Sequence, residues 1–418
     1  MDREILQSLF ELAVDRAQPA LAVERHLPEA PKGRTIVIGA GKASAQMARA
    51  FEQAWPHEIH AGLVVTRYGY AEACERIEIV EAAHPVPDAA GFAAAQRLKD
   101  LVSGLTPDDL VVALISGGGS ALLPAPADGL TLEDEQAVNR ALLASGAPIG
   151  VMNLIRNQFS TIKGGRLAAL AAPARVATLV VSDVPGDDPA LVASGPTISL
   201  AGTRAEARKF ADLYRLVLPE AVQAVLAGDD NPAPRSDDPR FVGNSVVTIA
   251  SAALSLTAAA EEARKRGIGA AILSDSIEGE ARDVALVHAA IAKEIAGRNQ
   301  PFAKPVVLLS GGETTVTLRG TGRGGRNGEF LLALAIALDG VAGVTALAGD
   351  TDGIDGSEDN AGAFVDGTSA QRMRAAGIDP LAAQANNDAY SAFEAIGDLF
   401  VTGPTGTNVN DFRAILIR

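Results

Sequence analysis

Apolar, strand-like runs that pass directly into glycine-rich loops recur along this sequence and constrain its fold more than any other feature. The runs at 35–38, 110–115 and 305–309 each lead into glycines, and segments with apolar residues at three- and four-residue steps separate them. Strands that alternate with helices in this way are typical of a mainly parallel sheet covered by helices on both faces. The sequence therefore predicts an α/β fold.

The composition favours the same architecture. Of the 418 residues, 48% are hydrophobic but only 4% are aromatic, so the core must be built from Ala, Val, Leu and Ile. That choice suits stacked α/β layers better than a β-sandwich rich in Tyr and Trp. A chain of this length is expected to form two or three domains, each able to bury its own core.

The expected elements alternate along both halves of the chain. In the first half, further strands are expected at 61–66, 75–83 and from 174, and helices at 2–25, from 43, at 88–103, at 131–146 and at 151–171. In the second half, strands at 245–250 and 270–275 alternate with helices at 251–266 and 279–297.

A stretch rich in Pro and Asp, at 227–241, lacks apolar periodicity and is predicted to be a linker. It divides the chain into an N-terminal domain, 1–238, and a C-terminal domain, 239–418. The final strand-like pieces, within about 400–418, are compatible with either sheet, so they are left open to rejoin the first domain.

Charge and residue counts exclude several classes of protein. The formal net charge is −15, and an acidic chain repels nucleic acid and anionic membranes, so neither is an expected partner. The single cysteine, Cys74, excludes an internal disulfide, and the five histidines lack zinc-site spacing. No signal-peptide core or membrane-spanning run is evident, so a cytoplasmic protein is expected.

The first glycine cluster, Gly39 to Ser44, nearly matches a dinucleotide-binding fingerprint, but Ser44 stands where Gly or Ala is usual. A tight strand–helix turn without a ligand is the alternative. Lys42 favours a ligand, because a lysine beside a helix N-terminus costs stability unless an anion is bound there. Gly41 and Lys42 are therefore candidate phosphate-binding residues.

The second cluster consists of Ser116, Gly117, Gly118, Gly119 and Ser120 and directly follows a predicted strand. Three consecutive glycines cost backbone entropy, which favours the close approach of a ligand. The loop is not a Walker A motif, because no Gly-Lys-Ser/Thr follows. All five residues are candidates for binding substrate or phosphate.

A third group lies in the helix expected at 151–171, where Asn153, Arg156, Asn157, Ser160 and Lys163 recur at three- and four-residue steps. The alternative is an ordinary solvated helix face. Two glycines and Arg166 directly after Lys163 weaken that alternative, so Asn153, Arg156 and Lys163 are kept as candidate ligand-binding residues.

Acidic loops follow other strands. Asp188 ends the loop 182–188, and Asp350 and Asp352 lie in the loop 349–356. One or two carboxylates with phosphate oxygens and water suit Mg²⁺, so these three residues are candidate metal ligands. Simple aspartate-rich turns are an equally weighted alternative.

The most basic loop, 319–329, contains Arg323 and Arg326 and follows Glu313. Arginines this close repel one another unless an anion or carboxylate joins them, and the guanidinium group suits phosphate and carboxylate oxygens. A polar loop at 402–411 precedes the last strand. His84, in His-Pro-Val-Pro-Asp, is interpreted as a structural residue of a turn rather than as a base.

Taken in order, these motifs resemble the glycerate 2-kinases of the MOFRL family (class II glycerate kinases), whose members also carry the name hydroxypyruvate reductase. The matching segments are GAGKAS, HPVPD, SGGGSALL, NQFSTIKGGRLA, SDVPGDDPALVASGPT, SGGETTVTLRGTGRGGRNGEF and GDTDGIDG. They span most of the chain, which makes the resemblance far more specific than any single loop.

The resemblance implies ATP-dependent, Mg²⁺-assisted phosphorylation of the 2-hydroxyl of D-glycerate, with Lys42 and Arg326 as catalytic residues. It also implies a Rossmann-like, three-layer N-terminal domain, a smaller α/β C-terminal domain and an active site in the cleft between them. ATP and D-glycerate are the expected small-molecule partners, and the sequence allows a homodimer.

Two other functions stay open at this point. An NAD(P)H-dependent hydroxypyruvate reductase would use the first glycine cluster as its dinucleotide site, although the fingerprint is imperfect. A non-catalytic protein that binds a small anion accounts for the basic loops but not for so many acidic ones.

Overall fold

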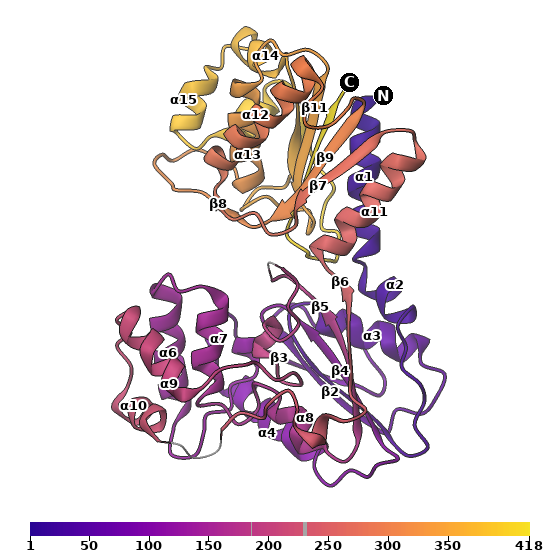
Figure 1. Ribbon diagram of the computed structural model, residues 1–418, viewed down its shortest axis with the longest axis vertical. Helices are drawn as coiled ribbons and strands as arrows, with labels where there is room; N and C mark the ends of the chain where they lie inside the picture. Colours follow the sequence, from indigo (N-terminus) through magenta and orange to yellow (C-terminus); the bar gives the residue numbers. More distant parts are fainter. Residues whose placement is uncertain (185, 229–231) are drawn as a thin grey trace. The chain divides into compact units, whose positions relative to one another are not determined.

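The computed structural model describes residues 1–184, 186–228 and 232–418 (Figure 1). Its contacts divide the chain into two compact units. Residues 19–184 and 188–249 form what we call the N-terminal unit, whereas residues 1–18 and 250–418, together with 186–187, form the C-terminal unit. Each unit has its own six-stranded sheet and its own apolar core.

The N-terminal unit is built on a sheet in the order β3-β2-β1-β4-β5-β6. Neighbouring strands from β3 through β5 are parallel, and every residue of β1 and β4 is buried, as expected for strands covered on both faces. The predicted mainly parallel sheet is confirmed. The strands are β1 (Thr35–Ala40), β2 (Ala61–Arg67), β3 (Glu78–Ala82), β4 (Leu110–Ser116), β5 (Arg175–Val181) and β6 (Ser245–Ala250).

Helices of the N-terminal unit form two groups. One group packs on or beside the sheet: α2 (Pro19–Glu24), α3 (Ser44–Ala54), α4 (Ala89–Leu101), α5 (Gly119–Leu122) and α8 (Arg166–Ala171). The other has a separate apolar core: α6 (Leu132–Ala144), α7 (Ile149–Asn157), α9 (Arg204–Leu213) and α10 (Glu220–Ala227). Two short 3₁₀ turns are η1 (Val192–Ser194) and η2 (Pro239–Phe241).

The single helix predicted over 151–171 is wrong in its extent. α7 ends at Asn157 and α8 begins at Arg166, and Ser160 between them forms an isolated bridge with Pro126. Gly164 and Gly165 have φ angles of +63° and +81°, a left-handed conformation that glycine adopts readily and that an α-helix cannot continue through.

The C-terminal unit contains a mixed sheet in the order β13-β12-β11-β14-β9-β7. Only the β7–β9 pair is parallel among the pairs of this sheet that the structure describes; β14 runs antiparallel to both β9 and β11. A separate pair joins β8 and β10. The strands are β7 (Gly269–Ser274), β8 (Gly279–Glu280), β9 (Val306–Gly312), β10 (Thr314–Thr315), β11 (Val344–Asp350), β12 (Gly362–Asp366), β13 (Leu399–Phe400) and β14 (Asp411–Ile417).

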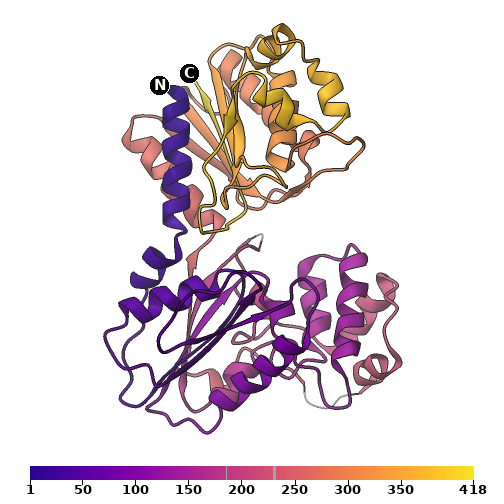
Figure 2. The ribbon, with the colours of Figure 1, turned by 180° about the vertical axis from the view of Figure 1, so that it is seen from behind.

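Helices cover both faces of this second sheet. Figure 1 shows α1 (Asp2–Arg16) and α11 (Ala252–Lys265) on one face, and α12 (Ala281–Arg298) and α13 (Arg326–Ala337) on the other. Both views place the two chain termini side by side, where Arg418 forms an ion pair with Asp2 at 2.9 Å (Figure 2). The remaining helices are α14 (Ser369–Ala375), α15 (Pro380–Ala385) and α16 (Ala389–Glu394).

The two units differ in two ways from the predicted domains, 1–238 and 239–418, and they settle one alternative that the sequence left open. Helix α1 belongs to the C-terminal unit, because its apolar stripe packs in one core with α11 and the second sheet. Strand β6 extends the first sheet beside β5, so the N-terminal unit continues through Ile249. The strands within 400–418, left open by the sequence, both belong to the second sheet.

The predicted linker at 227–241 therefore lies inside the N-terminal unit, and residues 229–231 of it are outside the described residues. Its lack of periodicity is real, but a non-repetitive segment occurs within a domain as readily as between two. A chain reversal back into the same sheet is decided by long-range pairing, which local composition does not encode.

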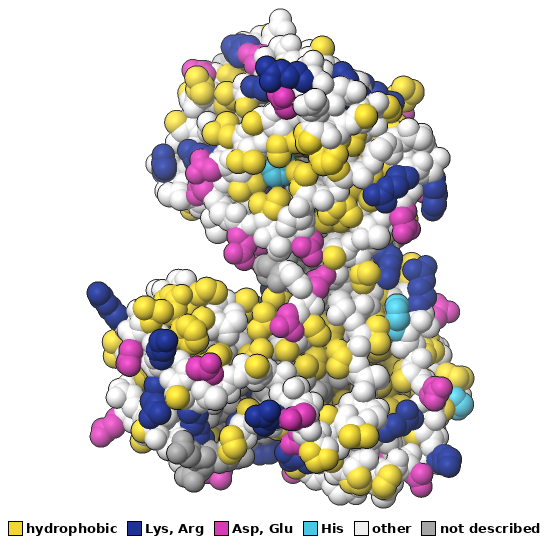
Figure 3. Space-filling model, viewed as in Figure 1, with side chains coloured by type: hydrophobic (Ala, Val, Ile, Leu, Met, Phe, Trp, Pro, Cys, Tyr) yellow, Lys and Arg dark blue, Asp and Glu magenta, His cyan; other side chains and the backbone are white. Residues whose placement is uncertain are grey.

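Lys and Arg are interspersed with Asp and Glu over the described residues of the face drawn in Figure 3. In the part of the chain that the structure describes, no helix is both long enough and apolar enough to cross a membrane.

Candidate active site

The first candidate site lies where the strand order of the N-terminal sheet reverses. β1 is flanked by β2, which follows it in sequence, and by β4, so the loops after β1 and β4 leave the sheet next to each other. Ligands of open α/β sheets bind at this switch point, beyond the carboxyl ends of the strands. These two loops are the predicted ones, carrying Lys42 and residues 116–120.

The two loops interlock through their backbones. The Lys42 N–H donates to the carbonyl of Gly117 at 2.8 Å, and the Ala43 N–H donates to Ser116 Oγ at 3.0 Å. Gly41 has a φ of +144°, and a Cβ there would lie 2.1 Å from Ser116 Oγ. The glycine is therefore required by the contact between the loops, a role that needs no ligand.

Lys42 and His84 meet over Gly118. A Cβ on Gly118 would lie 3.1 Å from Cε of Lys42 and 3.2 Å from Cδ2 of His84. Burial lowers the pKa of His84 to about 4, with the positive charges of Lys42 and Arg67 acting in the same direction. At neutral pH the imidazole of His84 is therefore uncharged, and it lies beside Lys42, the cation that the sequence analysis singled out in this loop.

Asn153, Arg156 and Lys163 are buried, so the alternative that they form an ordinary solvated helix face is wrong. Each also has partners inside the unit. Nζ of Lys163 donates to Glu135 at 2.6 Å, and Arg156 donates to Asn153 at 3.1 Å and to Asn139 at 2.9 Å. Burial lowers the pKa of Arg156 to about 10.

A chain of hydrogen bonds connects this buried group to the glycine loop. Ser120 Oγ lies 2.7 Å from Ser194 Oγ, and Ser194 Oγ donates to Asn153 Oδ1 at 2.8 Å. The predicted residues Asn153 and Ser120 are thus connected through Ser194, in an arrangement that supports the 116–120 loop. Glu135 and Asn139 were missed by sequence reasoning, because nothing local marks a buried partner many residues away; Ser194 lies in a segment that carries the family resemblance but was not predicted as a site residue.

The second candidate site lies in the C-terminal unit, at the start of α13. Arg326, the first residue of that helix, contacts three carboxylates: Nε donates to Asp411 at 2.7 Å, NH2 to Asp350 at 2.7 Å and NH1 to Glu313 at 2.9 Å. Glu313 and Asp350 were predicted as site residues. Asp411 was noted only as the end of a polar loop.

These three carboxylates come from the ends of adjacent strands. β14 runs antiparallel to β9 and β11, so its first residue, Asp411, lies opposite Gly312 at the end of β9 and Asp350 at the end of β11. Behind it, the fully buried Arg413 donates to Asp411 and to Thr314, the latter at 3.1 Å.

Burial and the concentration of charge shift several pKa values here. Burial alone would lower the pKa of Arg326, but Asp411 and Asp350 raise it above its usual value. Burial raises the pKa of Asp350 well above the usual range, despite Arg326, with Asp352 and Asp411 adding to the effect. Burial lowers the pKa of Arg413, which Asp411 opposes.

Asp355 holds the first turn of α13. Its carboxylate accepts the backbone N–H groups of Asn327 at 2.9 Å and Gly328 at 2.7 Å. Burial raises the pKa of Asp355 to about 6, although those two N–H groups favour the charged form. The sequence placed Asp355 in an acidic loop but did not connect it with the helix that carries Arg326.

Arg323 is directed elsewhere. Nε and NH2 donate to Glu358 at 3.0 and 2.7 Å, and the guanidinium lies 4.1 Å from the centre of the Tyr390 ring. Its side chain is 53% exposed, so this pair contributes little to stability and can be exchanged for a ligand.

The candidate metal ligands lie in both units. Asp188 is exposed and accepts the Ala190 N–H at 3.0 Å, whereas Asp350 accepts the Asp352 N–H at 3.1 Å. Among the described residues, no three His, Cys, Asp or Glu side chains are arranged to hold a metal. One or two carboxylates still fit Mg²⁺, which takes its other ligands from phosphate and water.

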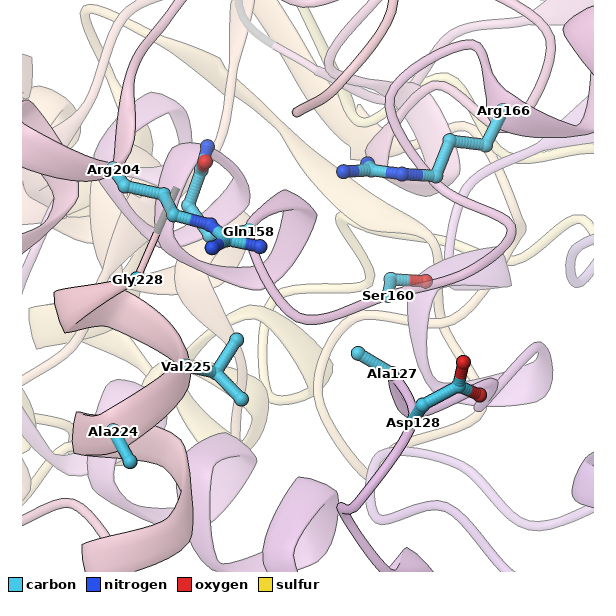
Figure 4. A pocket seen from close by; sticks show the side chains of 9 residues that line it. All are labelled: Ala127, Asp128, Gln158, Ser160, Arg166, Arg204, Ala224, Val225 and Gly228. Atoms are coloured by element: carbon cyan, nitrogen blue, oxygen red, sulfur yellow. The ribbon is translucent and has the colours of Figure 1, made fainter. Parts of the chain in front are cut away.

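A cavity of about 440 Å³ lies elsewhere in the N-terminal unit (Figure 4). Arg166 and Arg204 extend into it beside Gln158 and Ser160. Burial, together with the positive charge of Arg204, lowers the pKa of Arg166 to about 10. None of the predicted site residues belongs to the described lining of this cavity.

Known proteins match nearly the whole chain. The model of a domain of unknown function, DUF4147, matches residues 5–227, and that of the MOFRL family matches 306–411. A protein of Agrobacterium vitis with the provisional name hydroxypyruvate reductase is 53% identical over 99% of this chain and 94% of its own length.

A D-glycerate 2-kinase of Thermotoga maritima is 38% identical over 99% of this chain and 98% of its own length. The crystal structure of a glycerate kinase from Thermotoga maritima superposes with a TM-score of 0.91, at 38% identity, and covers 99% of both chains.

Proposed function

This chain belongs to the MOFRL family, and from that premise we propose that it is an ATP-dependent D-glycerate 2-kinase, which forms 2-phosphoglycerate and ADP. The observation that carries the proposal is similarity to a D-glycerate 2-kinase over nearly the full length of both proteins. Likeness of fold alone would be weaker support, since one fold hosts many functions.

The residues suit phosphoryl transfer. The 2-hydroxyl oxygen of glycerate forms a bond to the γ-phosphorus of ATP, the bond from that phosphorus to the bridging oxygen breaks, and the hydroxyl proton leaves to a base. Such a reaction needs positioning and stabilisation of charge more than covalent help from the protein. Lys42 and Arg326 supply positive charge for the phosphoryl group and the substrate carboxylate.

Two supporting roles follow from the geometry. Backbone N–H groups of the 116–120 loop are proposed to bind phosphate oxygens, since this loop lies at the strand-order reversal. The N–H groups of Gly41, Lys42 and Ala43 already donate to Val65, Gly117 and Ser116, so the Gly41 turn contributes by positioning Lys42. Asp350, whose pKa burial raises, is the proposed acceptor of the hydroxyl proton, because a raised pKa brings a carboxylate closer to the ideal for a general base.

Mg²⁺ is the proposed cofactor, held together with phosphate oxygens by Asp188, which leaves Asp350 for the hydroxyl proton; Asp350 and Asp352 are the alternative metal ligands, in which case Asp350 is not the base. When bound, it would neutralise charge on the phosphates. We further propose that the enzyme works in the cytoplasm and that it is a homodimer. Light scattering of the purified protein tests the oligomeric state directly.

The decisive experiment couples ADP release to a readout, with D-glycerate present or omitted. Lys42→Ala and Arg326→Ala should each lower kcat/KM by about 10²–10³, since each removes a preorganised charge from the phosphoryl site. Arg298→Ala is the matched control, because that arginine is 76% exposed and pairs only with Glu294 among the described residues. Near-normal turnover by a folded Lys42 or Arg326 variant would contradict the assignment.

The position of phosphorylation has its own test. Phosphate on the 2-oxygen couples to one carbon-bound proton, and phosphate on the 3-oxygen to two. The phosphorus NMR signal of the product should therefore be a doublet, and a triplet would show the 3-phosphate instead.

Hydroxypyruvate reductase is the second candidate function. It is the provisional name of a 53% identical relative, and the strand order of the N-terminal sheet is that of dinucleotide-binding domains. The residue at the end of β2 is Arg67, however, where an NAD-binding domain carries an acidic residue, so NADPH is the cofactor to test. Oxidation of NADPH by hydroxypyruvate at a rate above ADP release would favour this function.

A further inference from the structure

We propose that Asp411 is the residue that positions Arg326 for catalysis, and that the buried Arg413 holds Asp411 in place from behind. This rests on the proposed role of Arg326 in phosphoryl transfer. Asp411 is a positioning residue, because it acts on the substrate only through the guanidinium group.

The three carboxylates around Arg326 differ in how firmly they can hold it. Glu313 is 53% exposed, and an exposed pair is weak and mobile. Asp350 is 8% exposed, and Asp411 is not exposed at all. Asp411 also contacts Nε, the guanidinium nitrogen nearest the main chain, and that contact sets the plane of the group.

Asp411 is itself fixed by its other contacts. Oδ1 also accepts Nδ2 of Asn327 at 2.8 Å, and Oδ2 accepts Arg413. Arg413 is 1% exposed and is fastened to the end of β9, where NH1 donates to the Gly311 carbonyl at 3.2 Å. A carboxylate held from several directions cannot follow a moving guanidinium, so it imposes one orientation on Arg326.

This orientation leaves donors for a ligand. Arginine carries five N–H groups, and the contacts among the described residues use three of them, one on each nitrogen. One N–H on NH1 and one on NH2 remain for a ligand. That pair matches two oxygens of a phosphoryl group or a carboxylate.

The test compares two buried aspartates. Asp411→Asn keeps the shape of the side chain and removes its charge, and Asp398→Asn is the matched control. Asp398 is 2% exposed, lies in the same unit and pairs with two arginines, Arg3 and Arg372. Both variants should lose similar stability, whereas only Asp411→Asn should lower kcat, by about tenfold to a hundredfold.

A double-mutant cycle separates positioning from general damage. In an Arg326→Ala background, Asp411→Asn should change kcat/KM by less than about twofold, because its target is gone. Added guanidinium should restore part of the activity of Arg326→Ala but not of Arg326→Ala/Asp411→Asn. An equal loss in both backgrounds, or unchanged kcat in Asp411→Asn, would overturn the proposal.

Asp411→Glu covers the outcome in which the Asn variant fails to fold. This variant keeps the charge and lengthens the side chain. If Asp411 acts by positioning Arg326, kcat should fall; if only its charge matters, kcat should stay unchanged. A crystal structure of a folded Asp411 variant adds a readout without catalysis: Arg326 should leave the orientation it has beside Asp350. If the native enzyme does not phosphorylate D-glycerate, the proposed function fails, yet this structural result still decides the positioning.

Discussion

Gly118 has a φ of +80°, and a Cβ atom at this position would approach Lys42 to within 3.1 Å. The backbone therefore makes two demands that only glycine meets, left-handed geometry and room for the lysine stem. From the sequence, the three consecutive glycines were expected to allow the close approach of a ligand. In the structure, Gly118 is required at least in part by the close approach of Lys42, a residue of the protein itself.

Gly118→Ala should cost about 1–2 kcal/mol of folding free energy from the left-handed backbone, and should also displace Lys42. From the proposed role of Lys42 we expect kcat/KM to fall about tenfold or more, since small misplacements of a catalytic group are costly. Gly104→Ala is the matched control: its φ is +68°, and none of the described atoms lies within 4 Å of its Cβ position. Equal activity in the two folded variants would refute the role of Gly118.

Single residues also mark the limit of sequence reasoning about the site. Lys42 and Arg326 were singled out because a cation in a glycine-rich loop is a local signal, and their catalytic roles were implied by the family resemblance. Asp411 lies 85 positions from Arg326, and an aspartate at the start of a strand looks like any other. Its importance comes only from the antiparallel pairing of β14 with its neighbours.

The first turn of helix α13 is capped by a carboxylate that is almost as buried as the residues of the apolar core. Asp355 accepts two backbone N–H groups of the first turn, which are among those that a helix leaves unpaired. Burial and this hydrogen bonding act on its pKa in opposite directions, and burial prevails.

Stability should therefore depend on pH through Asp355. Its pKa is about 6 in the folded state against 3.8 ordinarily, so the folded state binds the proton more tightly. The stabilising effect of that proton is complete below about pH 4 and is lost as the pH rises through about 6. Asp355→Asn does not titrate. Between pH 4 and pH 7, the free energy of unfolding of the native protein minus that of the variant should fall by about 2–2.5 kcal/mol.

Urea unfolding of both proteins at several pH values measures this difference. Other groups, Asp350 among them, titrate in both proteins and largely cancel in the subtraction. A difference that stays flat, or that grows with pH, would contradict the raised pKa of Asp355.

The buried pair of Lys163 and Glu135 joins α6 to the segment between α7 and α8. Lys163→Met should destabilise the protein by about 3–5 kcal/mol, because it leaves Glu135 charged and unpaired. Lys163→Met/Glu135→Leu should recover most of that stability. Thermal unfolding measures both effects.

The same double variant tests whether Lys163 also binds substrate. If the lysine is structural, the double variant should retain KM for ATP and D-glycerate within about twofold, because no buried charge is left unpaired. A large rise in KM in a stable double variant would restore Lys163 to the binding site.

At the scale of the whole molecule, the chain leaves its first helix in the C-terminal unit before it builds the N-terminal one. Leu6, Leu9 and Phe10 of α1 are fully or almost fully buried, in one core with Leu256 and Phe412. Residues from both ends of the chain therefore pack into the core of the C-terminal unit.

A fragment of residues 250–418 should be unstable alone, because it lacks the three large apolar side chains of α1, each worth about 2 kcal/mol when buried. Joining residues 1–18 to its C-terminus through a short glycine–serine linker should restore cooperative unfolding, since Arg418 already pairs with Asp2. Circular dichroism during heating measures both fragments. Equal stability without the helix would count against this division of the chain.

The sequence by itself determined what neighbouring residues decide: the alternating strands and helices, the glycine loops after strands, and the cations Lys42 and Arg326. The strands, helices and loops follow from periodicity and from backbone sterics, which act over a few residues. The two cations stand out by their place in those loops, and the family resemblance implied their roles. Only the tertiary structure decided the allocation of α1 and β6, the interruption between α7 and α8, and the carboxylates gathered around Arg326. Those depend on which distant segments pair and on how deeply charges are buried, and burial is a property of the folded chain rather than of any segment of it.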